Sequence, residues 1–117
     1  MPSSLPTVKA DLFRALAHPT RIRILERLVE GERTVQNIQE ALTLEQPIVS
    51  QHLAALRTKN VVTVRREGTL AYYALRSPLV ADLLRIAREL LNHQLSESQT
   101  MLRELQREQR RGGSARV

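Results

Sequence analysis

Polar, hydrogen-bonding side chains gather on one short segment of the sequence, LEQPIVSQHLAALRTKN, which spans residues 44–60. Apolar residues recur through this segment at helical spacing, which predicts an amphipathic helix: Ile48, Val49, Leu53 and Leu56. A proline is tolerated only in the first turn of a helix, so Pro47 places the helix start near Glu45 or Gln46.

The polar face of this helix suits contacts with a DNA duplex. Amide, hydroxyl and imidazole side chains come first and a cation follows: Gln46, Ser50, Gln51, His52 and Arg57. Amides and hydroxyls can read base edges in the major groove, Ile48 can touch a thymine methyl, and Arg57 can bind a phosphate. The alternative is an ordinary solvated helix face, because a short pattern needs structural context.

The charge balance of the chain favours a polyanionic partner. Its 117 residues include 18 Lys and Arg against 12 Asp and Glu, a formal charge of +6. Most of the cations are arginines, whose planar guanidinium suits phosphate and guanine edges. Aromatic residues make up only 3 %, which argues against stacking platforms for single strands and favours duplex DNA.

Several other classes of protein are disfavoured by what the sequence lacks. Cysteine is absent, which excludes disulfides, thiolate metal sites and cysteine nucleophiles. No glycine-rich phosphate loop or cluster of His, Asp and Ser occurs, so we expect no enzymatic activity. The N-terminus lacks a signal-peptide pattern, and no apolar run approaches the roughly 20 residues of a membrane span, so a cytoplasmic protein is expected.

Two helices are expected ahead of the 44–60 segment. Residues 1–7 are rich in proline, serine and threonine, which predicts a flexible leader. Apolar residues recur at helical spacing from Val8 until Pro19 ends the first helix, and His18 should hydrogen-bond to backbone at that corner. A second helix follows at once and stops at Gly31.

A third short helix completes a helix-turn-helix. Thr34 is a good N-cap for it, and Thr43 and Leu44 then bridge to the helix of the 44–60 segment. Glycine, the usual small residue of such a turn, does not occur there.

The hydrophobic period then changes from helical to extended. Two β-rich runs, 61–66 and 70–75, flank a glycine-containing turn, which predicts a β-hairpin. Arg65 and Arg66 come just before the tip and Thr69 just after it, where they can reach a phosphate backbone or a minor groove. Alternatively, the charges protect an exposed strand edge from pairing.

The last predicted element is a long helix that opens at Ser77 and Pro78 and continues to about Gln106. Its apolar stripe outruns a globular core of this size: Val80, Leu83, Leu84, Ala87, Leu90, Leu91, Leu95, Met101, Leu102 and Leu105. We interpret it as a dimerisation helix, although it could fold back on its own domain. One domain is therefore expected over residues 8–106, with a disordered basic tail over 107–117.

Three blocks of the sequence resemble the ArsR/SmtB family of bacterial winged-helix repressors: LAHPTRIRIL at 16–25, PIVSQHLAALR at 47–57 and RREGTLAYYAL at 65–75. The resemblance runs from about Val8 to Leu95. It implies a mainly helical winged helix-turn-helix with a small β-hairpin wing, and a homodimer through the terminal helices. It further implies repression by binding an inverted-repeat operator, with each recognition helix in a major groove.

The sequence departs from the metal-sensing members of that family. Where they carry a pair of cysteines, this chain has Thr34 and Gln36. A second family site needs an Asp with a His two residues later, and a His with a His or Glu three residues later, but here Asp82 is followed by leucine and His93 by serine at that spacing. We therefore expect no metal cofactor. The pair His93 and Glu97, one helical turn apart, stays open as an unusual metal site across a dimer axis.

The leading hypothesis is a dimeric, sequence-specific repressor that binds double-stranded DNA and responds to an unknown small molecule, to a protein or to no effector. The candidate DNA contacts are Gln46, Ile48, Ser50, Gln51, His52, Arg57, Arg65, Arg66 and Thr69. The alternative is a dimeric protein-interaction module that binds DNA only nonspecifically.

Overall fold

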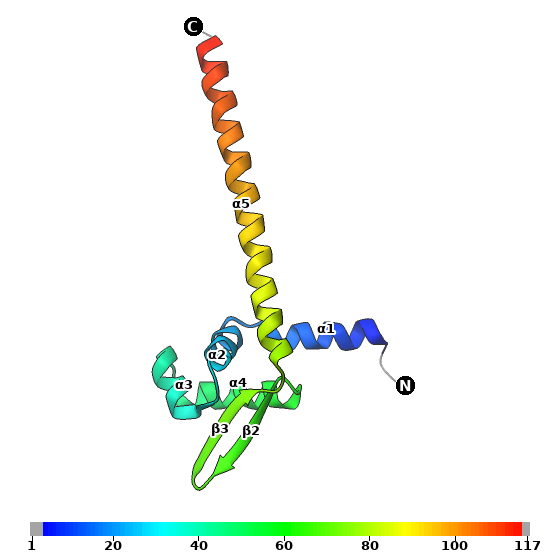
Figure 1. The fold of residues 1–117 in the computed structure, drawn as a ribbon, viewed down its shortest axis with the longest axis vertical. Coiled ribbons are helices and arrows are strands. Elements are labelled where there is room, and N and C mark those ends of the chain that lie inside the picture. The colour runs from blue at the N-terminus through cyan, green and yellow to red at the C-terminus, as the bar shows by residue number, and fades with distance from the viewer. Residues whose placement is uncertain (1–3, 116–117) are drawn as a thin grey trace. The chain divides into compact units, whose positions relative to one another are not determined.

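The computed structural model describes residues 4–115 and gives five helices and three strands over that range (Figure 1). In chain order they are α1 (Leu5–Leu16), α2 (Pro19–Val29), β1 (Arg33–Thr34), α3 (Val35–Leu42), α4 (Gln46–Thr58), β2 (Val62–Glu67), β3 (Leu70–Leu75) and α5 (Pro78–Ala115). The chain divides into two units, one up to residue 82 and one from residue 83 onward. The first unit is the mainly helical winged helix-turn-helix that the sequence predicts.

Local capping explains where the central helices begin. His18 is the N-cap of α2, and its Nδ1 accepts a hydrogen bond from the backbone N–H of Thr20 at 3.2 Å, which confirms its predicted backbone role. Thr34 caps α3 in the same way, through its Oγ1 and the N–H of Asn37 at 3.1 Å. The helix α4 begins at Gln46 with a proline in its first turn, as the sequence indicates.

The core of the first unit lies between α2, α3, α4 and the base of the β2–β3 hairpin. Its main side chains are at most 2 % exposed: Ile24, Leu25, Leu28, Ile38, Val49, Leu53, Leu56, Val61 and Val62. Burying a side chain of this size stabilises a fold by about 1.5–3 kcal/mol. Because α4 contributes three of these residues from one face, its polar face is fixed outward.

The strands form an antiparallel sheet in the order β1-β3-β2. Glu67 pairs with Leu70 at the hairpin tip, and the residues between them include Gly68, whose φ of 61° suits the first central position of a type II′ turn. Strand β1 was not predicted from the sequence. It pairs Arg33 with Tyr73, far along the chain, and its two residues show no periodic pattern.

The predicted flexible leader is wrong for residues 5–7, which belong to α1. Ser4 caps this helix, since its Oγ accepts a hydrogen bond from the N–H of Thr7 at 3.3 Å, and Pro6 lies in the first turn, where its missing N–H costs nothing. The residues that suggest coil by composition therefore start a helix. Residues 1–3 lie outside the described part of the chain.

The helix α5 starts at Pro78 as predicted, with the Oγ of Ser77 accepting a hydrogen bond from the N–H of Leu79 at 3.1 Å. It continues to Ala115, so the predicted disorder is wrong for residues 107–115, while residues 116–117 lie outside the description. Arg, Glu and Gln dominate this end and have high helix propensity, which outweighs the two glycines.

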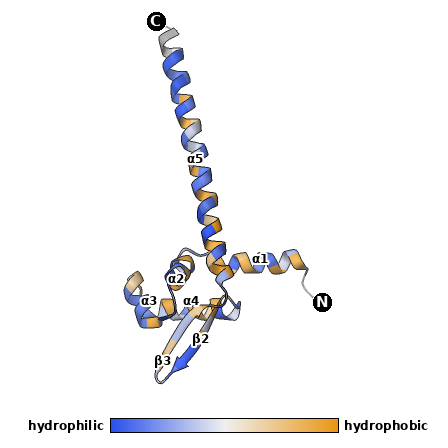
Figure 2. Ribbon diagram, viewed as in Figure 1, coloured by the Kyte–Doolittle hydropathy of each residue, from blue (hydrophilic) through white to orange (hydrophobic). Residues whose placement is uncertain are grey.

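Hydrophobic residues recur along α5 (Figure 2). Seven of them between residues 86 and 105 are more than half exposed: Ile86, Leu90, Leu91, Leu95, Met101, Leu102 and Leu105. Even so, no helix among the described residues is both long enough and apolar enough to cross a membrane.

Candidate nucleic-acid interface

The turn between α3 and α4 is built without glycine. Thr43 adopts the left-handed conformation, with φ of 55° and ψ of 52°, and its backbone N–H donates to the carbonyl of Gln39. The N–H of Leu44 donates to the same carbonyl at 3.0 Å. A β-branched residue is strained in this conformation, so the surrounding contacts must hold the turn.

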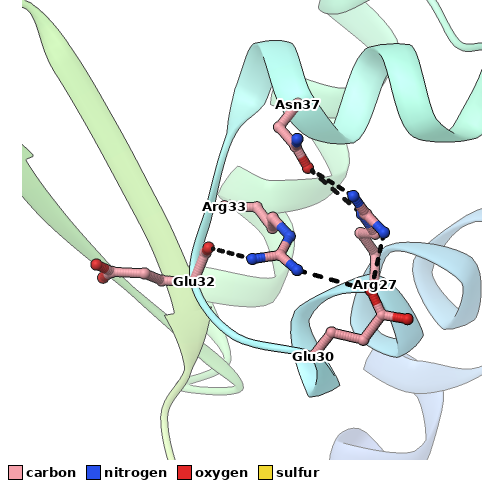
Figure 3. Close-up of polar contacts among 5 residues, drawn as sticks. All are labelled: Arg27, Glu30, Glu32, Arg33 and Asn37. Carbon is pink, nitrogen blue, oxygen red and sulfur yellow. Dashed lines mark hydrogen bonds and ion pairs between the residues drawn. The ribbon is translucent and has the colours of Figure 1, made fainter.

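Two arginines of α2 donate hydrogen bonds to residues of α3. Arg23 donates from Nη2 to the carbonyl of Leu42 at 2.9 Å, just before the turn. Arg27 donates from Nε and Nη2 to Oδ1 of Asn37, both at 3.3 Å, and forms an ion pair with Glu30 at 2.8 Å (Figure 3). These cations are occupied within the fold, so they do not add to a free DNA-binding charge.

The outward face of α4 carries most of the side chains that the sequence assigns to DNA. Gln46, Gln51 and Arg57 are exposed, Ile48 is 41 % exposed and Ser50 is half-buried. The opposite face of the helix is wholly buried in the core. The predicted division of this helix into a core face and a polar face is therefore present in the structure.

His52 differs from its neighbours on α4. It is half-buried, its Nδ1 accepts a hydrogen bond from Nε of Arg21 at 3.1 Å, and its ring centroid lies 4.4 Å from that of His18. Burial lowers the pKa of the His52 imidazole, and the nearby His18 and Arg21 lower it further. The structure thus engages His52 with α2, a role that the sequence assignment to DNA did not foresee.

The tip of α4 and the tip of the hairpin share one groove. Gln46 of α4 and Thr69 of the hairpin both line this groove, whose volume is about 480 Å³. Its complete lining is Thr34, Val35, Gln36, Gln39, Glu40, Gln46, Thr69, Leu70 and Ala71. Sequence reasoning missed Gln36 and Gln39, although two amides three residues apart on a short helix mark a polar face.

The two hairpin arginines lie in different surroundings. Both are exposed, but the Arg65 guanidinium forms ion pairs with Glu32 and Glu67, each at 2.6 Å. Within the part of the chain whose side chains are described, Arg66 makes no ion pair or hydrogen bond. Of the two hairpin arginines, only Arg66 therefore has a free charge.

The family model of the bacterial regulatory proteins of the arsR family matches residues 18–64, from the N-cap of α2 into β2. The HTH-type transcriptional regulator Rv0081 of Mycobacterium tuberculosis is 43 % identical over 109 residues, which cover 92 % of each chain. This chain belongs to the ArsR family. It is a helix-turn-helix transcriptional regulator with a DNA-binding fold.

Further relatives and solved structures agree with this assignment to the ArsR family. The probable mercury resistance operon repressor of Streptomyces lividans is 41 % identical over 75 % of this chain and 70 % of its own. The crystal structure of Rv0081 has a TM-score of 0.76 at 42 % identity, covering 82 % of this chain and 97 % of that chain. A homodimeric winged helix-turn-helix DNA-binding domain of Mycobacterium bovis has a TM-score of 0.70 at 32 % identity, covering 79 % and 91 %.

The residues of this ArsR-family chain do not fit the metal sites of the family's metal sensors. Thr34 uses its hydroxyl to cap α3, and Gln36 donates from Nε2 to Glu40 at 3.3 Å. His93 and Glu97 contact each other at 3.3 Å on α5, but among the residues that the structure describes no group of three or more His, Cys, Asp or Glu is placed to hold a metal ion. No thiolate donor exists in the sequence.

Proposed function

We propose that the chain is a homodimeric repressor that binds an inverted-repeat operator in double-stranded DNA. The observation that carries this proposal is the polar face of α4, which is fixed outward by three core residues and shares a groove with the hairpin tip. A helix of this kind enters the major groove while a wing contacts the neighbouring backbone or minor groove. We also propose that the protein acts in the cytoplasm and that it has no catalytic activity.

The side chains divide by chemistry. Base edges are read by the exposed or half-exposed residues near the start of α4, which are Gln46, Ile48, Ser50 and Gln51. Amides suit adenine, and an aliphatic side chain suits the thymine methyl. Arg57, Arg66 and Thr69 position the backbone through phosphate contacts. His52 stabilises the position of α4 through the hydrogen bond that it accepts from Arg21 of α2.

The second copy of the chain is proposed to pair through the terminal helices. The stripe on α5 between residues 86 and 105 leaves large apolar side chains exposed, and α1 does the same. The exposed residues of α1 are Leu5, Val8, Leu12 and Phe13, at 41–64 %. Apolar surfaces of this extent mark interfaces between proteins. The homodimeric domain of Mycobacterium bovis supports this proposal.

The effector is proposed to be something other than a thiolate-bound metal ion. The position of the family's cysteine pair is taken by Thr34 and Gln36, which are engaged in hydrogen bonds within α3. In one case, a small organic molecule or a protein releases the repressor from DNA. In the other, no effector acts and the concentration of the repressor alone sets the level of repression.

The first test is binding of the purified protein to its own upstream intergenic DNA and to a shuffled duplex, at two salt concentrations, with and without a strong chelator. We expect tighter binding to the native fragment at both salt concentrations and no effect of the chelator. Equal, weak binding to both duplexes that vanishes with salt would count against sequence-specific repression from this fragment. That outcome would favour a protein-interaction module, and operator selection from genomic DNA would decide between the two.

A further inference from the structure

Arg65 is the centre of a set of contacts that we name the Arg65 clasp: Glu32, Arg65, Glu67 and Tyr72. Nη2 of Arg65 lies 2.6 Å from Oε1 of Glu32, and Nη1 lies 2.6 Å from Oε2 of Glu67. Nε also donates to the other oxygen of Glu32, at 3.4 Å. The guanidinium carbon lies 4.6 Å from the centre of the Tyr72 ring. One guanidinium therefore has two carboxylates and an aromatic face as partners.

The clasp joins parts of the fold that are distant in sequence. Arg65 on β2 pairs with Tyr72 on β3, and Thr34 on β1 pairs with the same tyrosine. Glu32 lies directly before β1 and 33 residues before Arg65. The Arg65 side chain thus crosses the sheet from β2, over β3, to the segment that connects α2 with β1. It ties the hairpin to the body that carries the helix-turn-helix.

The charges within the clasp also neutralise Arg65. Two carboxylates face this single cation, and the hydrogen bond from Arg65 lowers the pKa of Glu32. The same two partners raise the pKa of Arg65, so Arg65 and Glu32 stay charged at neutral pH. A phosphate would have to compete with both carboxylates for this guanidinium.

Arg66 points to the opposite face of the sheet. Successive residues of a strand alternate between faces, so Arg66 shares a face with Val62 and Val64. Val62 is 1 % exposed and belongs to the core beneath the helices, so this is the face toward the helix-turn-helix. The free cation of the wing therefore lies on the side of the sheet that carries α4.

We propose that Arg65 is a structural residue that ties the hairpin to the segment before β1, and that of the two wing arginines only Arg66 contacts phosphate. The carboxylates of Glu32 and Glu67 keep a second wing cation away from DNA and so limit binding to random sequences. This inference rests on the proposed DNA-binding function.

The test compares salt dependences of binding to a shuffled duplex, which needs no known operator. One phosphate contact contributes about 0.9 to the slope of log affinity against log salt, or about 3.5-fold in affinity between 50 and 200 mM salt. Arg66→Gln should lower the slope by that amount, and Arg65→Gln should leave it unchanged. The double variant Glu32→Gln with Glu67→Gln should raise the slope by one contact, because Arg65 is released. Adding Arg65→Gln to that double variant should return the slope to the wild-type value.

Equal losses of slope in Arg65→Gln and Arg66→Gln would overturn the inference, because DNA binding would then depend on the Arg65 cation as much as on Arg66. No binding of the wild-type protein to any duplex would instead contradict the proposed function. The clasp itself has a readout without DNA, which is the NMR titration of the Glu32 carboxyl group. Its pKa should rise in Arg65→Gln and stay unchanged in Arg66→Gln, and an unchanged value in both would also overturn the inference.

Discussion

Arg21 donates a hydrogen bond from Nε to Nδ1 of His52 at 3.1 Å and so joins α2 to the helix α4. The same guanidinium donates from Nη1 to the carbonyl of Ala15 at 3.1 Å, which adds the end of α1. Nδ1 of His52 can accept this bond only while it carries no proton. This hydrogen bond between α2 and α4 therefore forms only while Nδ1 of His52 is unprotonated.

The free energy of unfolding should decrease as the pH is lowered and His52 becomes protonated. Burial, His18 and Arg21 lower its pKa in the folded state, whereas an unfolded histidine has a pKa of about 6.5. Between the two values the unfolded chain binds more protons, so the free energy of unfolding decreases as the pH falls below about 6.5. Thermal melting from pH 7.5 to 5 measures this decrease.

His52→Gln provides the specific control, because its amide oxygen can still accept from Arg21 but does not titrate. This variant should lose part of the pH dependence between pH 6.5 and 5. Profiles that coincide for wild type and His52→Gln would show that His52 is not the group responsible.

Thr43→Gly should stabilise the protein. Thr43 holds a left-handed conformation with φ of 55°, which strains a β-branched residue but not glycine. The relief of strain exceeds the added entropy of the unfolded chain, so the free energy of unfolding should rise by about 0.5–1 kcal/mol. Denaturant unfolding measures it, with Thr43→Val as the β-branched control that should bring no gain. A loss of stability in Thr43→Gly would show that the threonine side chain itself holds the turn.

Gln51→Ala and Arg57→Ala should weaken DNA binding in different ways. Gln51 is exposed on the outward face of α4, and loss of an amide that reads a base should reduce discrimination by about 1–3 kcal/mol. Arg57→Ala should weaken binding to the operator and the shuffled duplex alike and lower the salt slope by about one. Titrations of both duplexes at several salt concentrations measure these effects, and each variant is the control for the other. The same loss on both duplexes for both variants would contradict this division of roles.

Local patterns were sufficient to predict the central elements. The apolar spacing of α4 and the proline in its first turn gave its start, and a glycine between two β-rich runs gave the hairpin. Both signals lie within a few residues of the element that they specify. The side of α4 that meets the core also follows from periodicity alone.

Side-chain contacts between residues far apart in the chain could not be predicted from the sequence. The sequence predicts that Arg65 is a free cation of the wing. In the folded chain, however, Glu32, 33 residues earlier, lies 2.6 Å from it. The sequence likewise places His52 on a polar face, but in the structure it accepts a hydrogen bond from Arg21 of α2. The helical ends of α1 and α5 cannot be predicted for another reason. The composition of those segments suggests coil, although Pro6 and the polar residues of α5 are compatible with helix.

Leu102→Glu should weaken the proposed dimer. Leu102 is 55 % exposed on α5 and lies on the same helical face as Leu91 and Leu95, so pairing of two copies through this face would bury it. An unpaired carboxylate in an apolar interface is costly, and the dimer dissociation constant should rise at least about tenfold by sedimentation equilibrium. Thr100→Glu adds the same charge on the opposite side of α5 and should leave the constant unchanged. Equal effects of the two substitutions, with the helical circular dichroism retained in both, would mean that this face does not hold the two copies together.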